Sequence, residues 1–110
     1  MKEYMNGIHS LLEFNDVIDS NKTSVFVFSA SWCPDCQFIE PFMKEIVEQF
    51  HDFDFYYVDR DECMDICQQF MIMGIPSFLV FKESKEIGRF VSKARKTQQE
   101  ISIFLSGLKK

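Results

Sequence analysis

The feature that most constrains the fold is an alternation of short apolar runs with longer amphipathic stretches. Residues 24–29 (Ser-Val-Phe-Val-Phe-Ser) and 53–58 are short and apolar, which is typical of buried strands. Between them, residues 38–50 carry apolar side chains at three- and four-residue intervals, which indicates an amphipathic helix. Strands that alternate with helices predict a partly parallel sheet with helices on both faces.

The second half of the chain adds an antiparallel edge to this sheet. Residues 77–82 and 86–91 are expected to form a hairpin around residues 83–85. The pattern therefore predicts a three-layer α/β domain with a mixed β-sheet over residues 1–110. Further elements are expected as follows: a short strand at 5–8, a helix from a capping box at Ser10 and Glu13 to about Asp19, a kink or break at Pro41, a helical stretch at 61–71, and a last helix that opens at a second capping box, Thr97 and Glu100.

Composition narrows the classes of function. The chain has 110 residues, 46% of them hydrophobic, which suits a single domain with a real core. A net charge of −5 disfavours binding to nucleic acid. No apolar run approaches the roughly 18 residues of a membrane span, and residues 1–10 lack a signal-peptide pattern, so we expect a cytoplasmic protein without a membrane partner. Lys93, Arg95 and Lys96 form a local basic cluster, interpreted as a solvated loop.

Two of the four cysteines lie where thiol chemistry is favoured. A reducing cytosol argues against a static disulfide framework, which leaves redox catalysis, metal binding or simple burial. Cys33 and Cys36 follow the strand at 24–29 and open the next helix, where positions i and i+3 bring two side chains together. The positive end of a helix favours a thiolate, so Cys33 is expected to be the nucleophile and Cys36 the resolving thiol. Pro34 suits the first helical turn.

Several motifs resemble the thioredoxin family in order and spacing, over nearly the whole chain. They are Ser-Ala-Ser-Trp-Cys-Pro-Asp-Cys at 29–36, Pro41, Val-Asp-Arg-Asp-Glu at 58–62 and Gly-Ile-Pro-Ser at 74–77. The Cys-Pro-Asp-Cys centre looks especially like thioredoxin-like proteins of Bacillus-type bacteria. The resemblance implies a thioredoxin fold and a thiol–disulfide oxidoreductase that reduces protein or small-molecule disulfides. It also implies a redox-active Cys33–Cys36 disulfide, no cofactor or metal, and a reductase or low-molecular-weight thiol as electron donor.

Positions outside the two cysteines carry over from the same resemblance. Pro76 aligns with the family's cis-proline, and the backbone of Ile75 would then be free to pair with an extended substrate segment. An ordinary turn proline is the alternative. Trp32, Gly74, Ile75 and Val91 align with the apolar surface that receives the substrate peptide. Trp32 has a second interpretation as a simple packing residue.

Three positions depart from the family pattern. Val27 stands where the family usually has a buried Asp, and Tyr57 stands where a basic residue often pairs with that Asp. The usual proton acceptor for the resolving thiol is therefore missing. The spacer is Pro34-Asp35, and both residues are expected to tune the centre. In one interpretation, the Asp35 carboxylate is present only because the helix dipole favours a negative charge in the first turn. In the other, Asp35 interacts with both thiols: its charge opposes formation of the Cys33 thiolate, and it moves a proton for Cys36.

The second cysteine pair leaves three interpretations open. Cys63 and Cys67 lie four apart on a predicted helix, so both can share one face. They are buried or incidental thiols, a regulatory redox pair, or ligands that join Cys33 and Cys36 in a four-thiolate zinc site. A redox-inactive binding module with the same fold is a further alternative to an enzyme.

Overall fold

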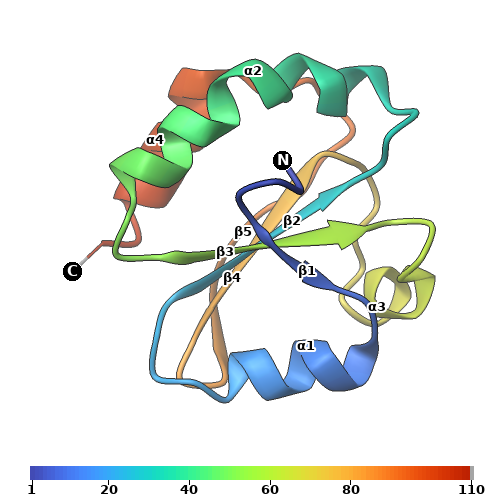
Figure 1. Cartoon of the computed structure of the whole chain (residues 1–110), viewed down its shortest axis with the longest axis vertical. Coiled ribbons are helices and arrows are strands. Elements are labelled where there is room, and N and C mark those ends of the chain that lie inside the picture. The colour runs from blue at the N-terminus through green and yellow to red at the C-terminus, as the bar shows by residue number, and fades with distance from the viewer. Residues whose placement is uncertain (110) are drawn as a thin grey trace.

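A mixed five-stranded β-sheet with helices on both faces forms the molecule (Figure 1). The computed structural model describes residues 1–109. The strands are β1 (Asn6–Ile8), β2 (Ser24–Ser29), β3 (Asp54–Asp59), β4 (Ser77–Lys82) and β5 (Lys85–Phe90), and the helices are α1 (Leu11–Ile18), α2 (Pro34–Gln49), α3 (Met64–Gln69) and α4 (Gln98–Ser106). This is the α/β architecture with a mixed sheet that the alternation predicts. In the described residues, no helix combines the length and apolarity that crossing a bilayer requires.

The strands run in the order β1-β3-β2-β4-β5, so β2 lies at the centre of the sheet. β1 and β2 are parallel to β3, whereas β4 is antiparallel to β2 and β5 is antiparallel to β4. The register places Val27 beside Tyr57 of β3 and Phe78 of β4. It also places Ser29 beside Asp59 at the end of the parallel pair.

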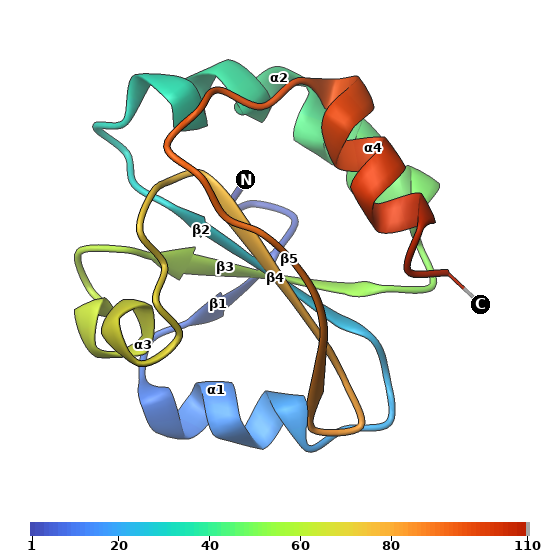
Figure 2. The ribbon, with the colours of Figure 1, turned by 180° about the vertical axis from the view of Figure 1, so that it is seen from behind.

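Helices α2 and α4 cover one face of the sheet, and α1 and α3 cover the other (Figure 2). Side chains of β2 alternate between the two cores: Val25 and Val27 belong to the core under α2 and α4, whereas Phe26 and Phe28 belong to the opposite one. All of β2 is buried. A strand covered on both faces has a continuous apolar sequence, which explains the pattern of residues 24–29.

Both predicted capping boxes open helices, but only one is reciprocal. The Thr97 hydroxyl accepts a hydrogen bond from the Glu100 amide, and the Glu100 carboxylate accepts one from the Thr97 amide. The Ser10 hydroxyl accepts from the Glu13 amide at 3.1 Å, while the Glu13 carboxylate accepts from the amide of His9. The side-chain cap of Ser10 is thus present in α1 without the returning bond to its own amide.

The hairpin differs by one residue from its predicted boundary, and the helix at Pro41 bends without a break. The hairpin turn contains only Glu83 and Ser84, because Lys82 lies opposite Lys85 and β5 therefore begins one residue earlier than expected. Both turn residues have positive φ values, 52° and 68°, which suit the right-handed twist of a two-residue hairpin.

Pro41 lies within α2, which continues through it as a single helix and bends along its length (Figure 1).

Candidate active site

The first cysteine pair lies at the N-terminus of α2, where the chain leaves β2. Cys33 is the N-cap of this helix, and its sulfur accepts a hydrogen bond from the Cys36 amide at 3.2 Å. Pro34 occupies the first turn, where its missing N–H leaves no helical bond unmade. The Cys33 sulfur therefore faces the positive end of the helix, which favours negative charge on that sulfur.

The segment before β4 forms the other wall of the site. The peptide bond between Ile75 and Pro76 is cis, the geometry that the resemblance implies. The Cys33 thiol lies 3.8 Å from the carbonyl oxygen of Ile75, to which it donates. Ala30, Cys33 and Cys36 form a small buried cluster, and Ile75 packs against it. Residues separated by more than forty positions thus meet around one sulfur.

Cys36 lies deeper than its neighbour and is 1% exposed. Burial raises the pKa of its thiol to about 12, and the hydrogen bond with Cys33 acts in the same direction. Hydrogen bonding to the Ser29 side chain and to the backbone of Ala30 lowers that pKa and only partly offsets the effect of burial. Cys36 is consequently a neutral thiol at physiological pH, and it must give up a proton before it can act as a nucleophile.

Asp35 is tied to a segment that follows β5. One of its carboxylate oxygens accepts a hydrogen bond from the Arg95 Nε at 3.0 Å. The Arg95 guanidinium in turn lies 4.4 Å from the centre of the Phe38 ring. The charge of Asp35 is therefore balanced by an exposed partner, an arrangement that suits its placement in the first turn of a helix.

Lys96 corrects the interpretation of the basic cluster. Lys93 and Arg95 are exposed, but Lys96 is 1% exposed and does not belong to a solvated loop. Its ammonium donates to the carbonyl oxygens of Ser92 and Ala94 and to the Ser92 hydroxyl. Burial lowers the pKa of Lys96. The charges of the cluster do not predict the burial of Lys96, because the oxygens that accept its hydrogen bonds are brought together only by the path of its own loop.

Trp32 is exposed beside the cysteine pair rather than packed into a core. Its side chain is 56% exposed. The indole N–H donates to the Asp61 carboxylate at 2.6 Å, and the Arg60 guanidinium lies 5.8 Å from the ring centre. Both partners follow β3, so this loop holds the Trp32 ring in a fixed position at the surface.

The remaining predicted surface residues lie together around the cis-proline. A Cβ atom on Gly74 would lie 2.6 Å from the carbonyl oxygen of Ser92, so only glycine allows the two backbones to approach this closely. Ile75 and Val91 are half-buried and pack against the same hydrophobic core. Pro76 is buried and directly precedes β4. Four of the five residues predicted to form the substrate surface, all except Trp32, thus lie where the backbones at Gly74 and Ser92 approach each other.

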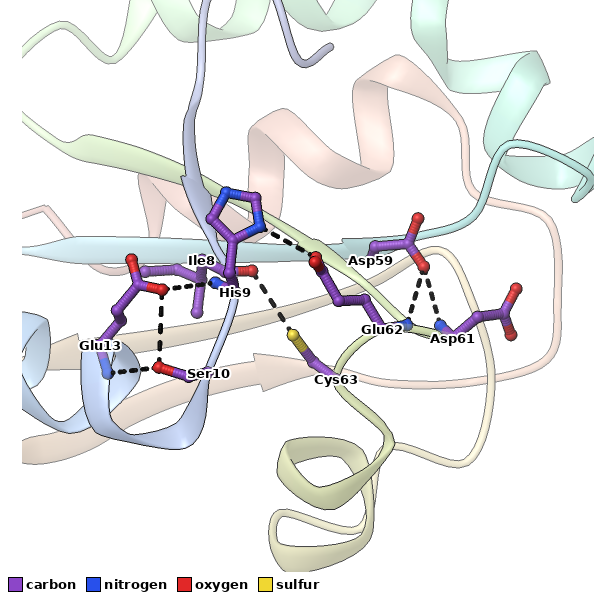
Figure 3. Close-up of polar contacts among 8 residues, drawn as sticks. All are labelled: Ile8, His9, Ser10, Glu13, Asp59, Asp61, Glu62 and Cys63. Carbon is purple, nitrogen blue, oxygen red and sulfur yellow. Dashed lines mark hydrogen bonds and ion pairs between the residues drawn. The ribbon is translucent and has the colours of Figure 1, made fainter.

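The second cysteine pair belongs to the opposite core, under α1 and α3. The Cys63 thiol donates to the carbonyl oxygen of Ile8 at 3.4 Å (Figure 3). Burial raises the pKa of Cys63 to about 11 and also raises that of Cys67. Within residues 1–109, no three His, Cys, Asp or Glu side chains gather as metal ligands would. The four cysteines therefore lack the arrangement that the zinc alternative requires.

Sequence reasoning missed one polar neighbour of Cys36. Ser29 ends β2 and is 1% exposed, and its side chain acts to lower the pKa of both Cys36 and Tyr57. Tyr57 was recognised only as a departure from the family pattern. The available signal was strand alternation, because Ser29 lies two residues after Val27 and so shares the face that Val27 presents to α2.

Comparisons with known proteins agree with this architecture. The family model described as Thioredoxin matches residues 8–106. The chain is 40% identical over 89 residues to Thioredoxin H2 of Arabidopsis thaliana, a match that covers 81% of this chain and 66% of that protein. It is 38% identical over 98 residues to Thioredoxin of Oryctolagus cuniculus, covering 87% of this chain and 92% of the relative.

Solved structures show the same fold. Thioredoxin from Trypanosoma brucei brucei superposes with a TM-score of 0.85 at 22% identity, covering 98% of this chain and 96% of that one. The thioredoxin of Malassezia sympodialis superposes with a TM-score of 0.76 at 30% identity, covering 90% of each chain. The predicted thioredoxin fold is therefore confirmed. With a family match that extends over most of its residues, the chain belongs to the thioredoxin family.

Proposed function

We propose that this chain is a thiol–disulfide oxidoreductase that reduces disulfides of proteins or small molecules through Cys33 and Cys36. The observation that carries the proposal is the geometry of Cys33. Its sulfur accepts a hydrogen bond from the Cys36 amide at the start of α2 and lies 3.8 Å from the Ile75 carbonyl oxygen. A sulfur held at a helix N-terminus suits nucleophilic attack on a disulfide.

The reaction consists of two exchanges. The Cys33 thiolate attacks one sulfur of the substrate disulfide, and the other substrate sulfur leaves as a thiolate that takes up a proton. The Cys36 thiol then loses its proton and attacks Cys33. The Cys33–Cys36 bond forms as the mixed disulfide breaks, and the second substrate sulfur leaves reduced. The dithiol is oxidised by two electrons, so an external dithiol or reductase must restore it.

We assign substrate contact to the surface around the cis-proline. Gly74, Ile75, Pro76 and Val91 lie together, and the Ile75 backbone can pair with an extended segment of the substrate. Trp32 offers a large exposed ring next to the nucleophile. These residues would hold a substrate disulfide against Cys33.

The setting of the reaction follows the remaining expectations. We propose a single domain over residues 1–110 that works in the cytoplasm without an organic cofactor, a metal, nucleic acid or a membrane. Its electron donor is a reductase or a low-molecular-weight thiol. The Pro34-Asp35 spacer is proposed to tune the centre, and its likeness to Bacillus-type bacterial proteins stays a prediction.

A turbidity assay tests this function. With dithiothreitol as electron donor, the chain should accelerate the reduction of insulin, and Cys33→Ser should return the rate to that of dithiothreitol alone. Cys36→Ser should instead accumulate a mixed disulfide with the substrate, visible by mass spectrometry. Cys63→Ala is the matched control and should keep the full rate. No acceleration by the unaltered chain would favour the redox-inactive binding module.

A further inference from the structure

The loop between β5 and α4, residues 91–97, contacts both walls of the candidate active site. On one side, the Arg95 Nε donates to the Asp35 carboxylate in the first turn of α2 at 3.0 Å. On the other side, the Ser92 carbonyl oxygen lies so close to Gly74 that a Cβ there would be 2.6 Å from it. Figures 1 and 2 both show this loop beside the segment that leads into β4. The path of the β5–α4 loop therefore affects the backbone next to the cis-proline.

The Lys96 side chain holds this loop in its path. Its ammonium donates to the carbonyl oxygens of Ser92 at 3.1 Å and of Ala94 at 3.2 Å, and to the Ser92 hydroxyl at 3.3 Å. An ammonium has three N–H donors, so donors and acceptors match in number. The side chain is 1% exposed, and its nitrogen lies 5.1 Å from the centre of the Phe90 ring. Because buried carbonyl groups need a hydrogen-bond partner, the inward turn of the loop depends on Lys96.

The Ser92 carbonyl group connects Lys96 to the predicted substrate surface. Its oxygen accepts a hydrogen bond from the Lys96 ammonium and is also the nearest atom to the position that a Cβ on Gly74 would occupy. The residue after Gly74 is Ile75, whose carbonyl oxygen lies 3.8 Å from the Cys33 sulfur. Contacts thus lead from Lys96 through Ser92 and Gly74 to the backbone beside the nucleophile.

We propose that Lys96 is a positioning residue for substrate recognition. Its ammonium holds the Ser92 carbonyl group against Gly74, and this contact keeps the Ile75 backbone where an extended segment of a protein substrate can pair with it. The hydrogen bonds of Lys96 all go to its own loop, so its effect on the substrate is indirect. A backbone that is already ordered loses less conformational entropy when the substrate binds. Lys96 therefore strengthens binding and leaves the thiol–disulfide exchange itself unchanged.

This inference rests on the proposed function, and two disulfides separate recognition from chemistry. Insulin carries its disulfides in a polypeptide, whose backbone can pair with that of Ile75. The aryl disulfide 5,5′-dithiobis(2-nitrobenzoate) has no peptide backbone, yet it reacts with the same Cys33 thiolate. A Cys33→Ser chain measures the background from the other thiols. An unaltered chain that does not reduce insulin would contradict the proposed function itself, whatever the Lys96 variants do.

Lys96→Met removes the three N–H donors and keeps an unbranched side chain. With dithiothreitol as electron donor, it should lower kcat/KM for insulin by about fivefold or more through a higher KM, because lost order in the free protein weakens binding. It should change kcat for insulin and the rate constant with the aryl disulfide by less than about twofold, since Cys33 is unaltered. A residue with a merely structural role would not separate the two disulfides at a temperature where the variant stays folded.

Gly74→Ala tests the contact from its other side. The added Cβ must displace the Ser92 carbonyl group, so this variant should also raise KM for insulin. The double variant with Lys96→Met should lose less than the product of the two single effects, because both substitutions disturb one contact. Single effects that multiply in full would show that Lys96 and Gly74 act independently, and would overturn the proposal.

Two further variants serve as controls. Lys93→Met removes an exposed charge of the same loop, and Val25→Ala removes buried methyl groups near the start of β2, whereas Cys33 follows the end of that strand. Both should keep the unaltered rates with both disulfides. Equal slowing of both disulfides by Lys96→Met, or slowing of neither, would overturn the proposal. If thermal unfolding shows that Lys96→Met is not folded in the assay, Lys96→Gln, which keeps two N–H donors on a shorter side chain, must show the same split in weaker form.

Discussion

The first cysteine of each pair lies at the start of a helix, but the two sulfur atoms form different hydrogen bonds. Cys33 is the N-cap of α2, and Cys63 is the N-cap of α3. The Cys33 sulfur accepts a hydrogen bond from the amide of Cys36, which lies three residues later in the chain. The Cys63 side chain makes no such cap, and its thiol donates to the carbonyl oxygen of Ile8 on β1.

The difference shows that a position at a helix start does not by itself activate a thiol. The direction of the sulfur decides, because only a sulfur that faces the free amides benefits from their partial positive charge. Helix α2 has 16 residues and α3 has 6, so the second helix also offers a weaker field. Around Cys63, burial and the charges of Glu62 and Asp65 all raise the pKa.

The largest expected contrast is in reactivity toward an alkylating agent. With a pKa of about 11, roughly one Cys63 in ten thousand is a thiolate at pH 7. In the reduced, folded chain, iodoacetamide should therefore label Cys33 at least about a hundred times faster than Cys63, and also faster than Cys67, whose pKa is raised as well. Peptide mass spectrometry at timed intervals measures this ratio. Comparable labelling of the two pairs would break the comparison.

A buried cation marks the first pair and not the second. The Lys96 ammonium satisfies three oxygens of its loop, so Lys96→Met should leave them without a donor and lower the free energy of unfolding by about 1–3 kcal/mol. Lys93→Met, at an exposed neighbour, should change it by less than about 0.5 kcal/mol. Urea unfolding compares the two variants. Equal effects would mean that Lys96 contributes no more than a surface lysine.

The raised pKa of Cys63 predicts a loss of stability in alkali. The folded chain keeps a neutral thiol up to about pH 11, whereas the unfolded chain releases that proton above its ordinary pKa of about 9. Between these values unfolding releases a proton, so the free energy of unfolding should fall by at most about 1.4 kcal/mol per pH unit. Cys63→Ala should fall less steeply in the same window. Parallel curves would show that Cys63 does not titrate differently in the two states.

The smallest effect is expected at Asp35. Asp35→Asn removes one exposed ion pair with Arg95, which should cost about 0.2–1 kcal/mol of stability. Arg95→Gln should cost the same, and the double variant should cost little more. Selective slowing of the second exchange in Asp35→Asn would instead support the interpretation in which this carboxylate moves a proton for Cys36.

Much of the fold could be predicted from the sequence because its signals are local. The four central residues of β2 and of β4 are all apolar, and Thr97 and Glu100 form the capping box that they predict. Boundaries were less predictable. The helical stretch expected at 61–71 begins only at Met64, because the Asp59 carboxylate binds the amides of Asp61 and Glu62 and holds them in a turn.

The active site likewise has features that local sequence signals predict and features that they do not. The position of Cys33 and Cys36 at a strand–helix junction follows from spacing, and the structure has that junction. The pairing of Asp35 with Arg95, the burial of Lys96 and the contact of Trp32 with Asp61 did not follow. Each joins side chains from elements that are distant in the chain or depends on a loop's own path, and neither composition nor periodicity carries that information.

The central place of β2 has a consequence for the chain as it leaves the ribosome. Both neighbours of β2 come later in the sequence: β3 closes one edge at residue 59, and β4 closes the other only at residue 82. Until then the most apolar strand has an unpaired edge, the kind of edge that recruits other chains. We therefore expect a nascent chain that stalls between these two points to be the species most in need of a chaperone.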